Sequence, residues 1–191
     1  MFTMLRAVVL LAVLGSSGCA SLSRNECSSG DWLGIGMRDG ANGHAEDRFV
    51  DHAAACVAHG INADREQWLL GREQGLERYC TARHAYNVGA SRSNYAGVCA
   101  GRAEQDFLHG YRLGGELAAA RDRREHWDHE IHHLRKQLDA DPKKQPPAGE
   151  APRRLSDSER VEIAYLLGVA LSRRDEASRD MEEINLLSQR L

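Results

Sequence analysis

The strongest chemical pattern in the sequence is His129-Glu130-Ile131-His132-His133, which has the spacing of a zinc-protease helix. On a helix, His129 and His133 lie one turn apart and could share a zinc ion, while Glu130 would activate a bound water. The chain holds 9 His in 191 residues, and four of them fall between residues 126 and 133. This local density of histidines makes an accidental match to the zinc-protease spacing easy to obtain.

The helix that would carry this motif turns the histidines away from its apolar side. Its apolar stripe is formed by Trp127, Ile131, Leu134 and Leu138. At 100° per residue, His129 and His133 fall on the opposite side, whereas a catalytic zinc needs ligands turned into a cleft, together with a third ligand. We expect a solvated His-rich face with no metal and no cofactor. The alternative is a metal-binding module or zinc-dependent hydrolase that uses His129 and His133, with Glu130 as base.

A second polar pattern, residues 39–43 (Asp-Gly-Ala-Asn-Gly), suggests a calcium loop. It lacks the later carboxylate of an EF-hand, so we interpret Asn42-Gly43 as a turn that caps the next helix. Nucleophile elbows, phosphate loops and CxxC redox pairs are absent from the sequence. The sequence therefore predicts no catalytic residue.

The first nineteen residues have the order of a secretory signal peptide. One basic residue, Arg6, precedes the apolar run 7–14, and small residues then lead to Cys19. The run is too short to span a bilayer, so residues 1–18 are expected to be removed. A Cys after small residues resembles the bacterial lipobox, although Ser16 stands where Leu is usual. We expect Cys19 to be lipidated and to hold palmitate or a similar acyl chain; an ordinary signal peptide would leave Cys19 as an incidental thiol.

The chain has five cysteines, and an odd number cannot all pair in disulfides in an oxidising compartment. Assigning Cys19 to lipid leaves four. These can form two disulfides in three ways. If helices 46–59 and 64–80 are antiparallel, Cys56 and Cys80 lie ~15 Å apart, beyond the ~7 Å that a bridge allows. We therefore prefer Cys27 with Cys56, and Cys80 with Cys99.

Helical periodicity dominates the chain after its N-terminal part, and we predict an all-α fold. Residues 19–44 are expected to form a lipidated tether and turns, and residues 45–117 a disulfide-stapled helical core with a loop over 81–98. Residues 118–191 would form a long antiparallel helical hairpin with a linker near 141–155. Its second helix should begin at a capping box of Ser156 and Glu159.

A large residue followed at three and seven positions by small residues recurs along the chain. The sets are Trp68-Gly71-Gly75, Phe107-Gly110-Gly114, Tyr165-Gly168-Ser172 and, less regularly, Leu33-Gly36-Gly40. Each set forms one stripe on a helix. Since glycine inside a helix costs about 1 kcal/mol relative to alanine, the repetition predicts close contacts between helices.

The ordered Trp, Gly, Tyr and Cys residues over about 30–117 resemble a family of small bacterial lipoproteins known only as a domain of unknown function. The positions that carry the resemblance are Trp32, Gly36, Asp39, Gly40, Cys56, Gly60, Gly71, Arg72, Gly75, Leu76, Tyr79, Cys80, Tyr95, Cys99, Phe107, Tyr111 and Gly114. Trp68 stands where a Tyr is expected. The resemblance implies export and lipidation and supplies no catalytic residue.

The net charge of -3, with both signs interspersed, disfavours nucleic acid as a partner. We expect a non-catalytic protein of the cell envelope, attached to a membrane through its N-terminal lipid. It would bind another envelope component or support envelope integrity. Because Ala20 is not the Asp of inner-membrane retention, the outer membrane facing the periplasm is favoured.

Overall fold

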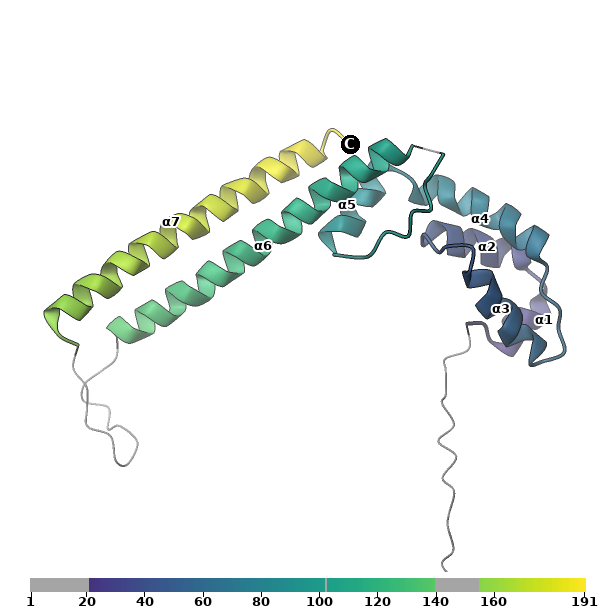
Figure 1. Ribbon diagram of the computed structural model, residues 1–191, viewed down its shortest axis with the longest axis horizontal. Coiled ribbons are helices and arrows are strands. Elements are labelled where there is room, and N and C mark those ends of the chain that lie inside the picture. Colours follow the sequence, from purple (N-terminus) through teal and green to yellow (C-terminus); the bar gives the residue numbers. More distant parts are fainter. Residues whose placement is uncertain (1–20, 102, 140–154) are drawn as a thin grey trace, which may run out of the picture.

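The computed structural model describes residues 21–101, 103–139 and 155–191, and within these ranges every regular element is a helix. The helices are α1 (Arg24–Ser29), α2 (Trp32–Ala41), α3 (Arg48–Val57), α4 (Arg65–Tyr79), α5 (Ala82–Ala90), α6 (Glu104–Leu138) and α7 (Asp157–Ser188). Figure 1 shows α1 to α4 gathered at one end and the long helices α6 and α7 extending away from them. The predicted all-α class is confirmed.

Two segments that we expected to lack helices are helical. Residues 19–44 contain α1 and α2, and the expected loop 81–98 contains α5. The interpretation was wrong because the many Ser, Gly and Asn residues of both segments, Gly89 among them, were taken as signs of turns, although Gly36 and Gly40 also fitted the recurring helical spacing. In the structure these glycines lie inside helices and face the backbone of a neighbouring helix.

Helices α2 and α4 pack at backbone contact. A Cβ atom added to Gly36 would overlap the carbonyl oxygen of Trp68, and one added to Gly71 would overlap that of Leu33. The contacts of Gly40 and Gly75 continue one turn further along both helices. Because the contacts advance in the same direction on each helix, α2 and α4 run parallel.

Helices α5 and α6 repeat this arrangement. Added Cβ atoms on Gly110 and Gly114 would overlap the carbonyl oxygens of Ala82 and Tyr86, as those on Gly71 and Gly75 would overlap residues of α2. Gly89 occupies the place that Gly40 has in the first pair, since its Cβ would meet α6 just after Tyr111. The core thus contains the same parallel, glycine-packed helix pair twice.

Each helix pair also has a disulfide in the same topological place. The bonds join Cys27 to Cys56 and Cys80 to Cys99, with Cα–Cα distances of 5.4 and 5.5 Å, which is the pairing preferred from the sequence. Each bond links the segment before the first helix of a pair to the connection between its two helices. Closing such loops stabilises a domain by about 3 kcal/mol per bond, chiefly through the unfolded state.

Helices α6 and α7 lie side by side and run in opposite directions (Figure 1). Leu138 and Leu155 share one apolar cluster, while Leu117 and Ile184 share another. The predicted stripe of Trp127, Ile131, Leu134 and Leu138 lies in the first cluster. The predicted capping box of Ser156 and Glu159 begins α7. None of the described helices has the length and apolar character needed to cross a bilayer.

Candidate functional site

A buried polar cluster centred on Asp39 lies inside the first helix pair. The Asp39 carboxylate oxygen Oδ2 accepts hydrogen bonds from the indole Nε1 of Trp68 and from His52 Nε2, each at 2.8 Å. The other ring nitrogen of His52, Nδ1, lies 2.8 Å from the hydroxyl of Ser21. Asp39 is 5% exposed and His52 1%. Such buried polar groups are costly unless hydrogen-bonded, and here each is.

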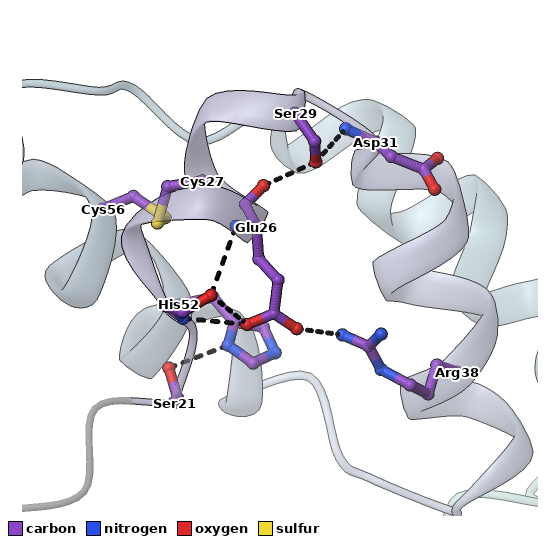
Figure 2. Close-up of a disulfide and its surroundings, with 9 residues drawn as sticks. Ser21, Glu26, Cys27, Ser29, Asp31, Arg38, His52 and Cys56 are labelled. Atoms are coloured by element: carbon purple, nitrogen blue, oxygen red, sulfur yellow. Dashed lines mark hydrogen bonds and ion pairs between the residues drawn. A yellow bond between two sulfur atoms is a disulfide. The ribbon is translucent and has the colours of Figure 1, made fainter.

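Four separate segments bring these side chains together. Asp39 lies in α2, His52 in α3 and Trp68 in α4, while Ser21 precedes α1. The glycine contacts between α2 and α4 allow Asp39 and Trp68 to meet. The Cys27–Cys56 disulfide fixes α1 to α3, and Figure 2 shows Ser21 and His52 beside it.

The N-terminal helix is tied to α2 by a second, exposed set of contacts. Ser23 and Glu26 form a capping box at the start of α1, and the Glu26 carboxylate accepts from the Arg38 guanidinium at 3.1 Å (Figure 2). Hydrogen bonds from the Ser23 backbone and hydroxyl, with the Arg38 charge, hold the pKa of Glu26 below its usual value. The segment that follows Cys19 is thus packed into the domain from its first described residues.

The hydrogen bonds of the cluster have fixed donors and acceptors at two of its members. The Trp68 indole only donates, and the Asp39 carboxylate only accepts. His52 therefore donates from Nε2 to Asp39, and its Nδ1 atom forms a second hydrogen bond with the Ser21 hydroxyl, whose direction depends on the tautomer. The order Ser, His, Asp is also that of a nucleophile, its base and an orienting acid.

Burial argues against a catalytic use of this array. A general base must reach the proton that it removes from a bound substrate, whereas the His52 ring lies within the apolar core around Trp32, Cys56 and Trp68. Leu22, the residue after Ser21, is 2% exposed in the same core. The arrangement is therefore suited to holding the N-terminal segment in place.

The second helix pair shows that this fold does not require the polar cluster. The register of glycine contacts places Val88 of α5 where α2 has Asp39, and Phe107 of α6 where α4 has Trp68. Both of these residues are buried in an apolar core. The carboxylate of Asp39 thus stands at a position that an aliphatic side chain fills in the second pair, which points to a specific role for the first pair.

Arg72 extends the polar region of the first pair towards the surface. It is 5% exposed, its Nε donates to the carbonyl oxygen of His44 at 2.8 Å, and its guanidinium lies 5.9 Å from the centroid of the Trp68 ring. A cation over an indole face is favourable when it is desolvated. Arg72 thereby fixes the chain that follows α2 and covers Trp68.

The histidine motif of α6 lies on the exposed side of the helix. His129 is 80% exposed and its Nε2 atom lies 3.9 Å from Glu125, while His133 Nδ1 lies 3.4 Å from the Gln137 amide. Among the residues that the structure describes, no three His, Cys, Asp or Glu side chains form a group able to hold a metal ion. Within the described ranges, His129 and His133 are therefore not accompanied by a third side chain that could complete a metal site.

The polar segment 39–43 ends a helix and does not begin one. Asn42 is the C-cap of α2, and Gly43 follows with φ of +73°. The expected capping of the next helix was wrong, because α3 begins only at Arg48 after an Asp47 that makes no side-chain cap. The buried Asp39 was not recognised as a site residue, since its partners His52 and Trp68 are distant in sequence.

A cavity lies outside the cluster, where α5, α6 and α7 meet. Its volume is about 600 Å³, and its lining includes Thr81, Asp106, His109, Leu113, Leu187 and Arg190. Nearby, the Tyr86 hydroxyl donates to Asn185 at 3.0 Å, which joins α5 to the end of α7. Cys19 and the signal-like residues 1–18 lie outside the described ranges.

These observations define a class: a disulfide-linked, all-α domain built from two glycine-packed helix pairs, with a buried polar cluster inside the first pair. Residues 31–116 match the family model described as "Protein of unknown function (DUF2799)", which confirms the resemblance to a domain of unknown function over this part of the chain. The match covers both helix pairs and ends inside α6. No curated protein and no solved structure gives a significant match.

Proposed function

We propose that the protein is a non-catalytic, lipid-anchored protein of the bacterial cell envelope, attached through Cys19. The observation that carries this proposal is the use of the cysteines. Four of the five form disulfides with one another, so Cys19 is the one left over. Paired cysteines suit an oxidising compartment, and the signal-like order of residues 1–18 supplies the route to it.

The N-terminal contacts support a domain that sits directly at the membrane. Ser21 is bonded to His52, and Leu22 is buried, within three residues of Cys19. A lipid on Cys19 would therefore hold the helical core at the bilayer surface without a long tether. The outer membrane, on its periplasmic side, is the favoured location, because Ala20 carries no retention signal.

The extension formed by α6 and α7 supports a role in binding. It continues far beyond the family domain, which ends near residue 116, and it carries exposed apolar side chains on α7. Such a helical face can pack against a partner helix. We propose that this extension presents its surface to another envelope component or helps to maintain envelope integrity.

Metabolic labelling with palmitate tests the anchor. Wild-type protein should incorporate the label and remain in the membrane fraction. The Cys19→Ser variant should lose the label, and its amount in the soluble fraction should rise at least about tenfold, because several acyl chains are needed for stable anchoring. Ser21→Ala, which keeps Cys19, is the matched control and should be labelled like the wild type. Equal labelling of wild type and Cys19→Ser would refute the anchor.

A further inference from the structure

Helix α3 has two sides of different chemistry. His52 and Cys56 lie on its buried side and face the core of the first helix pair. Val50, Ala54 and Val57 are exposed, and we call these three residues the α3 outer face. At 100° per residue they fall within about 60° of one another, on the side opposite His52. Val50 is 66% exposed and Val57 61%.

Little charge accompanies the α3 outer face. Residues 53–58 (Ala-Ala-Ala-Cys-Val-Ala) contain no charged side chain, although 28% of the chain is charged. Arg48 and Asp51, near the start of α3, form an ion pair with each other at 3.4 Å. An exposed apolar face can serve as a contact for a protein or for a membrane. The position of α3 in the molecule therefore has to identify what covers this face.

The position of α3 identifies a lipid bilayer, given the lipid on Cys19 that is proposed above. The Ser21 hydroxyl lies 2.8 Å from His52 Nδ1, beside the Cys27–Cys56 disulfide (Figure 2). Cys19 comes two residues earlier, so its Cα atom lies at most about 7 Å from that of Ser21. A helix with its side chains is about 10 Å wide. The lipid therefore holds the bilayer surface within about one helix diameter of the segment that is bonded to α3.

The other helix beside the anchored segment has a polar surface. Helix α1 is joined to α3 by the Cys27–Cys56 disulfide. The exposed residues of α1 and of its N-cap are Ser23, Arg24, Asn25, Ser28 and Ser29. Of the two helices that the disulfide joins, α3 is thus the one with an apolar face towards the surroundings.

Helix α3 is also the element that distinguishes the first helix pair from the second. In the second pair, the described residues between the two helices, 91–101 and 103, form no α-helix. The additional helix of the first pair carries His52, which is bonded to Ser21, on one side and the α3 outer face on the other. Both sides of α3 are thereby related to the segment that follows Cys19.

We propose that the α3 outer face lies in the bilayer–water interface beside the lipid on Cys19, with Val50 and Val57 in contact with the acyl chains. This inference rests on the proposed anchor. An amphipathic helix lies along a membrane with its apolar side buried at the boundary of headgroups and acyl chains. Because α3 is short and its exposed side chains are small, its outer face does not hold the protein on a membrane by itself. The anchor supplies the effective concentration that the contact needs.

The reactivity of an introduced thiol measures this contact. Full-length, lipidated Val50→Cys in phosphatidylcholine vesicles should react with a membrane-impermeant maleimide at least about fivefold more slowly than the same variant with Cys19→Ser, which stays in solution. Val161→Cys is the matched control, and its rate should change less than about twofold, because no lipid covers it. Val161 is also a valine, is 70% exposed, and lies on α7, which Figure 1 shows extending away from α3.

A charge on the α3 outer face should reverse the protection. In the lipidated Val50→Cys background, Val57→Glu should restore at least about half of the rate seen in solution, because a carboxylate is costly among acyl chains. Val161→Glu should leave the protection unchanged.

Flotation of the vesicles separates this inference from the anchor itself. Protein that floats with the vesicles but reacts at Val50→Cys as fast as in solution would overturn the inference and leave the anchor intact. Equal protection of Val50→Cys and Val161→Cys would reject α3 as the contacting face. Protein with an unmodified Cys19 that does not float would refute the anchor, and this inference with it.

Discussion

Replacing Gly71 with alanine should lower the free energy of unfolding by about 3 kcal/mol or more. The added Cβ would overlap the carbonyl oxygen of Leu33, and that oxygen belongs to a helix backbone that cannot rotate away. Relief requires α2 and α4 to separate, which also loosens the hydrogen bond from Trp68 to Asp39. Urea unfolding followed by circular dichroism at 222 nm measures the change.

Gly115→Ala is the control for that substitution. Gly115 lies in α6, and a Cβ there has open space, so the variant should gain up to about 1 kcal/mol from helix propensity. Both substitutions replace glycine with alanine, yet their effects on the free energy of unfolding should have opposite signs. If Gly71→Ala were as stable as Gly115→Ala, the backbone contact between α2 and α4 would be wrong.

Replacing Asp39 with alanine should be about as damaging, at about 3 to 5 kcal/mol. The change removes the acceptor of both Trp68 Nε1 and His52 Nε2, and both donors lie where water does not reach. Release of His52 should also free Ser21, so amide hydrogen exchange should quicken first at the N-terminal segment. Equilibrium unfolding together with exchange mass spectrometry gives both readouts.

Asp31→Ala is the matched control on the same helix. Asp31 is exposed and caps α2 through Gly34, so its loss should cost only about 1 kcal/mol. A double-mutant cycle between Asp39→Ala and His52→Ala should show a coupling above about 1 kcal/mol, since both changes break one network. Additive effects, or equal losses for Asp31→Ala and Asp39→Ala, would contradict the cluster.

The two helix pairs share their glycine contacts but differ in their buried side chains. The second pair has Val88 and Phe107 where the first has Asp39 and Trp68, and the described residues between its two members, 91–101 and 103, form no α-helix in the place of α3. The first pair is therefore specialised for holding the segment after Cys19. The second instead supports α7, through the hydrogen bond from Tyr86 to Asn185.

Local sequence was sufficient where neighbouring residues determine the structure. The capping box of Ser156 and Glu159 begins α7 because both partners lie within one turn. The same holds for the four-residue apolar stripe of α6, whose period places Ile131 and Leu134 on one side. For the disulfides, helical rise disfavoured a bridge between Cys56 and Cys80 and left two pairings, and the structure has the one that was preferred.

The glycine spacings were recognised in the sequence, but their use depends on the neighbours they meet. Gly71 and Gly168 stand in the same local pattern, yet the first touches a helix backbone and the second open space. The helices α2 and α5 were missed for the related reason that a glycine-rich segment has low helix propensity by itself. Packing of α2 against α4 and of α5 against α6 offsets the low helix propensity of glycine. This packing joins residues that are distant in sequence, so a short stretch of sequence does not reveal it.

What the sequence by itself determined is the all-α class, the helices with strong periodicity and the family resemblance, because each depends on spacing along the chain. The tertiary structure alone decided that Asp39, His52, Trp68 and Ser21 meet. Their separations in sequence run from 13 to 31 residues along the bonded pairs, and no local rule links them. Parallel helix pairing brings them together, because contacts between backbones fix which side chains are buried beside one another.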